Sequence, residues 1–568
     1  MGDGRRDPAL TSELANKASG LVPEVFYLTE GLVTNISDLV ASKGRAAALR
    51  NLHFIDGKWT SNDTGWSKHR ATTFKNSAAA ADEFEELAVH VLDAGTEKFV
   101  MQVGNKAWSY DVLANPATEV EAALFTATSA SVPCMRSYSG AFFIYVNGVD
   151  EPQKWPGTGV FALLQKDTGA GLGNWPPVIS GVTYSKPKIC EIFVSRLVTA
   201  RFTGDEFRIL ISKFEDPENY DVSGSSPSRA GVIKVKNFLG PIRGLKALKL
   251  SNDSNEEVLV VACRKGVGVI IGTDADTFQF IVLTTEYGIL TNRTWIQLDN
   301  DLFFLASDGI RKLSALVVNA NLLQSSLTYP IQQVIRDINK SAVERAFAVR
   351  HANTLEVIFW FPTGTETRNR RALIMNYSAS SPEGGIVPVF SEKLTPPETG
   401  VASTHRSPSC GISYESRVWC GGYNGYLQEH YKTAMYDTEI IQFLYRSPLF
   451  STNNPAQAAD LLMAQLLLDG GDQDFTVNIY AYEQTQDGNT RKRLAGSRII
   501  KTSTAGTTII GSWIIGESAF SAAGPQIVEA TAPGNGRLWQ LEIVGLTSTA
   551  SINFVGFESI LVAGGLRQ

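Results

Sequence analysis

The glycine-rich run Gly266-Val-Gly-Val-Ile-Ile-Gly272 is the segment of the sequence that most resembles a phosphate loop. Such a loop needs glycines that let backbone N–H groups approach the ligand, and a following helix whose N-terminus points at the phosphate. Here the glycines lie within apolar, β-branched sequence, and no helical pattern follows. The pattern therefore favours strands that contain glycine over a nucleotide site.

Acidic residues and histidines give no metal or acid–base signature. Asp274-Ala-Asp276 lacks the further spaced carboxylates and the closing glutamate of an EF-hand, so we predict a turn between strands there. No HxH, HExxH or Gly-x-Ser-x-Gly motif is present. We predict no catalytic, cofactor-binding or metal-binding residues and no cofactor. The six histidines are dispersed: His53, His69, His90, His351, His405 and His430.

Glycoside hydrolysis is the enzymatic alternative. It requires two placed carboxylates, or an arginine cluster if the sugar itself carries a carboxylate. Acidic residues are numerous, so spacing does not exclude a pair. Ser307-Asp-Gly309 resembles the centre of an Asp-box, but Arg311-Lys312 stands where Thr-Trp should follow. The preferred prediction is a protein that is not an enzyme, with a propeller-type hydrolase or depolymerase as the alternative.

Two basic clusters, Arg368-Asn-Arg-Arg371 and Arg491-Lys-Arg493, lie at expected hairpin tips. Two interpretations remain open: solvated loops, or contact with a partner subunit, lipopolysaccharide or passing DNA. Neither cluster has the interleaved aromatic residues of a single-strand binder. The net charge of −6 over 568 residues argues against tight wrapping of nucleic acid.

The five cysteines are scattered and form no CxxC motif. Cys190 and Cys263 lie in apolar runs, where cysteine behaves as a small hydrophobic residue. We therefore expect reduced thiols in a chain that folds in the cytoplasm. Cys410 and Cys420 flank an expected hairpin, so a bond between them in the presence of oxidant is the minority alternative. The polar start Met1–Pro8 does not predict a secretory signal.

The elements that must position these residues are short apolar runs interrupted by glycine or aspartate turns. Runs of this length and composition predict buried strands in hairpins, here spaced by roughly 40 to 55 residues, as in propeller blades. The expected fold is all-β: an N-terminal arm at 1–50, an irregular β-propeller-like body at 51–435 and a C-terminal β-sandwich-like domain at 436–568. Clear examples are 99–112, 141–148, 258–272, 302–310 and 355–364.

A few helices are expected beside the strands. Thr11–Ala18 and the Ala-, Leu- and Arg-rich segment Lys43–Leu52 favour helix in the arm. Pro330–Lys340 places four apolar residues on one helical face, and Ser341-Ala-Val-Glu344 matches a capping box. In the C-terminal domain, Phe475–Tyr482 alternates as a half-buried strand should.

An ordered series of phrases resembles the tail nozzle, or tail hub, proteins of short-tailed bacteriophages (the tail tubular protein B-like family). The resemblance covers roughly residues 50 to 435 and is less clear in the arm and after 436. Its phrases are Phe54–Trp59, Gln102–Lys106, Trp108–Asp111, Pro133–Tyr138, Val146–Gly148, Lys186–Ile189, Arg196-Leu197, Ser212–Pro217 and Leu302–Arg311.

The resemblance implies a structural virion protein. Members of this family form a ring, usually a homohexamer, below the portal and adaptor, and the ring surrounds the channel for ejection of double-stranded DNA. The implied partners are copies of the same chain, the adaptor or head–tail connector above, and tail fibre, spike or needle proteins nearby. Transient contact with double-stranded DNA and with the host envelope is also implied. The implied location is the phage tail, and a receptor-binding or adaptor tail component is a further alternative.

Overall fold

In the computed structural model, the chain forms two compact units. Unit 1 comprises residues 1–67, 374–394 and 431–568, and unit 2 comprises 68–373 and 395–430. The described residues are 22–27, 31–34, 45–55, 57–61, 64–74, 82–92, 95–112, 114, 122–165, 175–223, 225–249, 257–298, 301–314, 326–378, 388–395, 407–433, 435–437, 439–451, 459–471, 475–484, 490–502, 519–520, 525–547 and 552–563.

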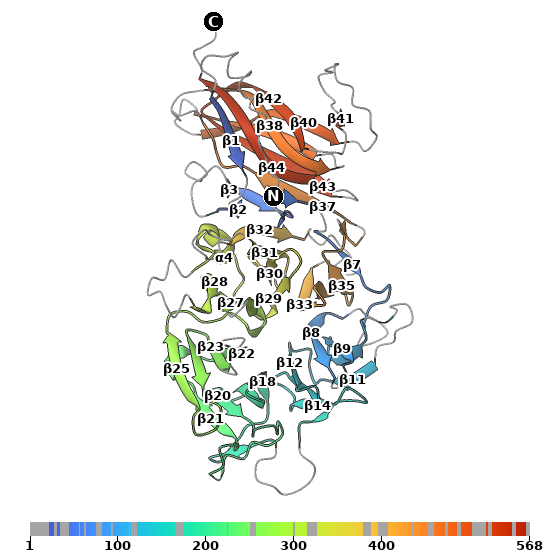
Figure 1. The fold of residues 1–568 in the computed structure, drawn as a ribbon, viewed down its shortest axis with the longest axis vertical. Helices are drawn as coiled ribbons and strands as arrows, with labels where there is room; N and C mark the ends of the chain where they lie inside the picture. The colour runs from blue at the N-terminus through green and yellow to red at the C-terminus, as the bar shows by residue number, and fades with distance from the viewer. Residues whose placement is uncertain are drawn as a thin grey trace. The chain divides into compact units, whose positions relative to one another are not determined.

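Unit 2 is a series of small antiparallel sheets, here called blades 1 to 7, that follow one another along the chain (Figure 1). Blades 1 to 4 have four strands each. They are β8 (Phe84–Val91), β9 (Glu97–Val103), β10 (Lys106–Tyr110) and β11 (Ala122–Thr126); β12 (Cys134–Tyr138), β13 (Phe142–Val146), β14 (Gln153–Trp155) and β15 (Ala162–Leu163); β18 (Pro187–Phe193), β19 (Arg196–Phe202), β20 (Asp205–Ile211) and β21 (Gly231–Lys234); and β22 (Ile242–Lys249), β23 (Glu257–Cys263), β24 (Val267–Ile271) and β25 (Gln279–Thr284).

Blades 5 to 7 are smaller within unit 2. Blade 5 has three strands, blade 6 begins with two paired strands, and blade 7 has three. Their strands are β26 (Ile296–Leu298), β27 (Asp301–Ala306) and β28 (Gly309–Lys312); β29 (Phe347–His351) and β30 (Glu356–Phe361); and β33 (Pro408–Tyr414), β34 (Arg417–Gly422) and β35 (Leu427–His430).

The blades close into a ring through their first strands. β8 contacts β12, β12 contacts β18, and β18 contacts β22. The short 3-10 helix η2 (Asn292–Thr294), just before β26, joins β22 to β29, and β33 then contacts both β29 and β8. The first strands begin 50 to 61 residues apart, at residues 84, 134, 187, 242, 296, 347 and 408. The all-β, propeller-like body expected from the sequence is therefore confirmed.

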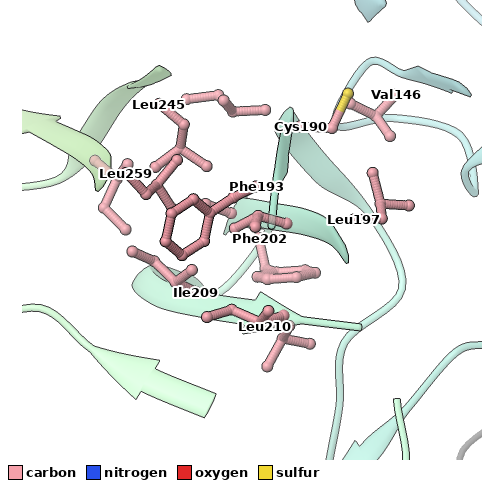
Figure 2. Close-up of a cluster of buried hydrophobic side chains, with 14 of the residues drawn as sticks. Val146, Cys190, Phe193, Leu197, Phe202, Ile209, Leu210, Leu245 and Leu259 are labelled. Atoms are coloured by element: carbon pink, nitrogen blue, oxygen red, sulfur yellow. The ribbon is translucent and has the colours of Figure 1, made fainter. Parts of the chain in front are cut away.

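Apolar side chains fill the space between neighbouring blades. Figure 2 shows one such cluster, to which β18, β19 and β20 of blade 3 and β22 and β23 of blade 4 contribute. Phe193, Leu197 and Leu245 in this cluster are fully buried. Each blade packs against a neighbouring blade on both of its faces, so its strands are continuous apolar runs and do not strictly alternate between apolar and polar residues. This explains why short apolar runs recur along the sequence.

Unit 1 contains two groups of longer strands. β38 (Ala459–Gly471) pairs with β42 (Pro525–Gly536) and with β44 (Ile552–Ala563), which also pairs with β1 (Val22–Tyr27) and β6 (Lys58–Thr60). β43 (Leu538–Thr547) pairs with β37 (Glu439–Arg446) and β39 (Phe475–Gln484), and β39 pairs with β40 (Thr490–Thr502). β42 also contacts β39 and β40, so the two groups pack as in a β-sandwich.

Burial along β39 confirms the alternation expected there. Phe475, Val477, Ile479 and Ala481 are buried, and the residues between them are half-buried. The remaining described strands are β2 (Gly31–Leu32), β3 (Arg45–Ala46), β4 (Ala48–Arg50), β5 (His53–Ile55), β7 (Trp66–Lys68), β16 (Val178–Ile179), β17 (Val182–Thr183), β31 (Arg371–Asn376), β32 (Val389–Leu394), β36 (Met435–Tyr436) and β41 (Ala519–Phe520).

The helix predicted over Lys43–Leu52 is wrong, since this segment holds β3 and β4. β4 pairs antiparallel with β37 and in parallel with β32, so hydrogen bonding on both edges overrides the helical preference of its alanine and leucine. The helix predicted over Thr11–Ala18 lies outside the described residues. Strand β1 of the arm pairs with β44, within unit 1.

The helix expected at Pro330–Lys340 is present but shorter. A 3-10 turn, η3 (Tyr329–Ile331), leads into α4 (Gln332–Arg336), and Ile331, Val334, Ile335 and Ile338 are all buried as expected. The helix stops early because Ile338 forms a β-bridge with Thr363. The capping box is wrong: η4 (Val343–Arg345) has no side-chain cap.

The division into units differs from the expected domain ranges. The third segment of unit 1 begins at residue 431, close to the expected boundary at 435/436, but unit 1 also takes in residues 51–67 and 374–394. These segments carry β5, β6 and β32, which pair with strands of unit 1. The local sequence did not indicate that these segments belong to unit 1, because pairing between strands distant in the chain leaves no local pattern. Among the described residues no helix has the length and apolar character needed to cross a membrane.

Candidate functional site

A cavity of about 380 Å3 lies where the first strands of the blades meet. Its walls come from β8, β12, β18, β22, β29 and β33, with the segment around η2 in place of a first strand in blade 5. Each blade of the ring therefore contributes to one central cavity. The volume is in the range of small-molecule sites.

The charged side chains of this cavity are mostly cationic. Two carboxylates, Glu86 and Glu344, also line it. The cations come from five different elements, so only closure of the ring brings them together. They are Arg136, Lys188, Arg201, Arg243, Lys246 and Arg293.

Four of the six cations have carboxylate partners. Arg293 Nε lies 3.0 Å from Glu86 Oε2, and Arg136 Nε lies 3.0 Å from Glu191 Oε2. Glu344 serves two cations, at 2.8 Å from Lys188 Nζ and 3.3 Å from Arg201 Nη2. Glu206 also lies 3.7 Å from Arg201 Nε, so four carboxylates face these four cations and fix one side of the cavity wall.

Arg243 and Lys246 are different. In the described part of the chain, no carboxylate lies within ion-pair distance of either side chain. Arg243 donates from Nη1 to the Leu290 carbonyl oxygen at 3.0 Å, which satisfies a donor but not the charge. Burial, and then repulsion from Arg201 and Arg264, lower the pKa of Arg243. The two residues are half-buried on β22, on either side of the fully buried Leu245.

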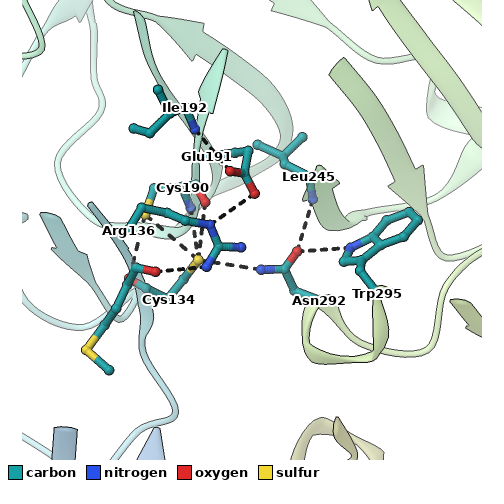
Figure 3. Close-up of polar contacts among 9 residues, drawn as sticks. Cys134, Arg136, Cys190, Glu191, Ile192, Leu245, Asn292 and Trp295 are labelled. Carbon is teal, nitrogen blue, oxygen red and sulfur yellow. Dashed lines mark hydrogen bonds and ion pairs between the residues drawn. The ribbon is translucent and has the colours of Figure 1, made fainter. Parts of the chain in front are cut away.

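A network of neutral and charged groups supports the wall beside these cations (Figure 3). Asn292 Oδ1 accepts from the Leu245 backbone N–H at 3.1 Å and from the Trp295 indole at 3.3 Å. Asn292 Nδ2 donates to Cys134 Sγ at 3.5 Å. The network thus links blades 2, 4 and 5 and leaves these side chains little freedom to move.

The pKa values of the two carboxylates in the cavity are shifted in opposite directions. Burial raises the pKa of Glu86, although Arg293 opposes this effect. Burial also acts to raise the pKa of Glu344, but Lys188 and Arg201 outweigh it and hold that pKa below its usual value. Both carboxylates are engaged with cations, so the arrangement is suited to holding a negatively charged group.

The sequence motifs that suggested chemistry lie elsewhere. Gly266 to Gly272 forms β24 and its ends, and a Cβ at Gly268 would lie 2.6 Å from the Ile281 carbonyl oxygen of β25. Asp274 forms the turn after β24 by accepting the Asp276 and Thr277 backbone N–H groups at 3.0 Å. Both findings confirm the structural interpretation of those segments.

Ser307-Asp-Gly309 forms the turn between β27 and β28. Asp308 pairs with Arg311, whose side chain is buried and lies 3.3 Å from the ring centroid of Tyr287. Within the described residues no group of three or more histidine, cysteine or acidic side chains is arranged to hold a metal ion.

The arginines at 368–371 are not an open basic patch. Arg368 pairs with Glu83 at 2.7 Å, Arg370 with Glu366 at 2.8 Å, and Arg371 with Asp337 at 3.0 Å. Asn369 between them is fully buried and donates to the Arg345 carbonyl oxygen at 2.7 Å. The cluster fastens the connection after β30 to the rest of unit 2.

The basic cluster at 491–493 begins β40. Arg491 and Lys492 are exposed, and the Lys492 ammonium lies 3.8 Å from the ring centroid of Tyr480. Arg493 pairs with Glu483 at 2.9 Å across the hairpin. This cluster therefore remains on the surface of unit 1, as both sequence interpretations require.

The five cysteines are all buried, and none of them forms a disulfide bond. The register pairs Cys410 with Gly421 and Gly411 with Cys420, which places the two thiols on opposite faces of the hairpin. The minority alternative of a bond between them is therefore wrong. The sequence did not indicate that Cys134 and Cys190 lie together, with their Sγ atoms 3.8 Å apart.

The cationic cavity was also missed. Its only trace in the sequence is a lysine or arginine within the first strand of successive repeats, as at Arg136, Lys188 and Arg243. From sequence alone, such residues are interpreted as solvent-exposed strand positions, because the arrangement of the blades around them is not known.

Comparison with known proteins identifies no relative by sequence. No family model and no curated protein matches the chain. Among solved structures, the chain is similar to the WD40 β-propeller domain of Doa1, with 10% sequence identity and a TM-score of 0.35. That likeness covers 64% of this chain and 97% of the other.

Proposed function

We propose that this protein is a structural component of a bacteriophage short tail, a nozzle or hub whose copies form a ring around the channel for double-stranded DNA. The proposal rests on the ordered resemblance to tail nozzle proteins. It is supported by an all-β, propeller-like unit and a second unit rich in long strands. The ring of subunits, six in this proposal, is distinct from the ring of blades within each subunit.

The observation that carries the proposal is where the resembling phrases fall. Gln102 is fully buried, donates to the carbonyl oxygens of Gly104 at 2.8 Å and Ser131 at 3.3 Å, and accepts from the Tyr145 hydroxyl at 2.8 Å. It thereby ties the hairpin of blade 1 to blade 2. Such a residue serves the framework rather than a reaction.

The phrases at Arg196-Leu197 and Ser212–Pro217 meet in the same way. Ser212 Oγ accepts from the Leu197 backbone N–H at 2.9 Å, and Arg196 Nη1 donates to the Ser212 carbonyl oxygen at 2.9 Å. A resemblance concentrated on residues that hold strands and loops together supports a shared scaffold. This pattern is expected of a structural protein that functions as part of an assembly.

The test is the mass of the particle that the purified chain forms. Sedimentation velocity and negative-stain microscopy, alone and with the adaptor and fibre or needle proteins of the same virion, should show a closed ring of several copies. A chain that stays monomeric under both conditions would overturn the proposal. A density map of the intact particle would distinguish a nozzle from a receptor-binding or adaptor component.

A propeller-type glycoside hydrolase stays the second candidate because of one observation. Arg136, Arg201 and Arg243 approach a common cavity, and an arginine cluster suits a sugar that carries a carboxylate. Turnover of host capsule or lipopolysaccharide by the isolated protein, lost in Glu86→Gln, would favour this candidate. Absence of turnover together with ring formation would favour the nozzle.

A further inference from the structure

We propose that the central cavity of unit 2 binds a small multivalent oxyanion, a phosphate ester or a polycarboxylate, and that Arg243 and Lys246 supply the charge that holds it. This binding site is independent of the proposed role in the tail. It follows from the cavity, from the excess of cations in it and from the absence of carboxylate partners for these two residues among the described parts of the chain.

The charge balance indicates the sign of the ligand. Six cations face Glu86 and Glu344, and Glu191 pairs with Arg136 from just outside the lining. Glu206 also pairs with Arg201, at 3.7 Å from its Nε. Four carboxylates thus serve four cations, and Arg243 and Lys246 are left over. A half-buried cation without a partner carries a cost in solvation that an anion in the cavity removes.

The positions of the two residues indicate the size of the ligand. They lie three positions apart on β22, and the fully buried Leu245 between them anchors the strand. A cavity of about 380 Å3 has room for a compact anion, whereas a folded partner or a DNA duplex does not fit in it. Two separate cations favour a ligand with at least two negative charges over a monovalent ion.

The donors of the cavity also fit oxygen ligands. Arginine presents a planar fork that matches carboxylate and phosphate oxygens, while lysine acts as a point charge. Arg243 uses one terminal nitrogen on the Leu290 carbonyl oxygen, so its orientation is fixed before a ligand arrives. Fixing a side chain beforehand lowers the entropy cost of binding.

Isothermal titration calorimetry at constant ionic strength tests the proposal with two probes, inorganic pyrophosphate and citrate. The wild-type chain should bind at least one of them with a stoichiometry of one per chain. Pyrophosphate alone would identify a phosphate site, and citrate alone a carboxylate site. No saturable binding of either probe at millimolar concentrations would overturn the proposal.

A double variant, Arg243→Gln with Lys246→Gln, should raise the Kd by at least about 100-fold, because each of the two charge-assisted hydrogen bonds contributes about 1.5–3 kcal/mol, which is about 10- to 100-fold in Kd. The matched control, Lys249→Gln with Lys265→Gln, removes the same charge from exposed positions at the end of β22 and near β23. The control should bind within about twofold of wild type on the same scale. An equal loss in both variants would show general charge attraction and overturn the site.

A second measurement covers failure of the double variant to fold. Pyrophosphate should raise the melting temperature of the wild-type chain in proportion to the logarithm of its concentration. The single variant Lys246→Gln should weaken that rise, while Lys249→Gln should not. A rise of equal size in both single variants would contradict the proposed site. Neither measurement depends on ring assembly. A negative result would therefore overturn the anion site without affecting the proposed function in the tail.

Discussion

A Cβ atom added to Gly421 would lie 2.4 Å from the Cβ of Phe84, so the last blade meets the first where no side chain separates them. Gly421 is on β34 and Phe84 begins β8, more than three hundred residues earlier. Phe84 is fully buried in a cluster that also contains Leu427 and Trp419 of blade 7. This close approach is part of what closes the ring.

Gly421→Ala should lower the stability of unit 2 by about 1–3 kcal/mol, because the added methyl group overlaps Phe84 in a packed core. Urea denaturation followed by tryptophan fluorescence measures the effect. Gly181→Ala is the control: its φ of 79° carries a backbone cost of about 1–2 kcal/mol without any nearby atom. Unchanged stability in Gly421→Ala would show that the contact between blades 7 and 1 yields easily.

Arg196 holds a long connection of blade 3. Its guanidinium is buried and donates to the carbonyl oxygens of Ser212 at 2.9 Å, Arg229 at 2.7 Å and Pro227 at 3.1 Å. Arg196→Met should cost about 3–5 kcal/mol, since several buried carbonyl groups lose their donor at once.

The matched control for Arg196 is Lys265→Met, which changes an exposed cation on blade 4 and should shift stability by less than about 0.5 kcal/mol. The urea midpoint measures both variants. Similar midpoints for the two would mean that the connection holds without Arg196.

Glu85 gives unit 2 a pH dependence. Its side chain is buried, and this burial raises the pKa to about 7 from 4.5, although Arg345 opposes the shift. The folded state therefore binds a proton more tightly than the unfolded state. Glu85 costs no stability below pH 4.5, and its contribution becomes unfavourable as pH rises through about 7, by up to about 3 kcal/mol.

Glu85→Gln should remove that decline. The difference between variant and wild type in free energy of unfolding should be more favourable to the variant at pH 8 than at pH 5. Urea titrations at the two pH values measure it. Glu415→Gln changes an exposed carboxylate and serves as the control. A difference that does not vary with pH would show that Glu85 is ionised throughout.

Cys134 and Cys190 form a buried thiol pair between blades 2 and 3. Cys190 and its backbone N–H donate toward Cys134 Sγ, and this lowers the pKa of the Cys134 thiol. Treatment with diamide should join the two sulfurs, with loss of both thiol protons and reduction of the diamide. The expected mass change is about two daltons on the linked peptides, and closing a loop of roughly 55 residues should raise stability by about 3–4 kcal/mol.

Mass spectrometry after alkylation measures this reaction. In Cys134→Ser the bond should not form, and Cys263, which is also buried, should be alkylated as before once the protein is unfolded. A mixed set of bonds involving Cys263, Cys410 or Cys420 would contradict a specific pair.

Much of the architecture followed from local sequence. The hairpins at 99–112, 258–271 and 302–312 were predictable because apolar runs and turn residues are adjacent in the chain. The strand at 48–50 was not, because its partners lie near residues 392 and 445 and impose a conformation that alanine and leucine do not favour alone. The cavity was not predictable for the same reason: Arg243 and Lys246 form part of a cavity only together with residues from strands of other blades.

Unit 2 is inserted in sequence between segments of unit 1, and this has a consequence for biosynthesis. Strand β1 pairs with β44, Val22 against Leu561, so the first described strand to leave the ribosome waits about 540 residues for its partner. At 5–20 residues per second, that interval is about half a minute to two minutes. All of unit 2 has by then been translated, while Val22–Tyr27 has stayed an unpaired edge open to other nascent chains. Cotranslational chaperone binding near the N-terminus would protect it during this interval.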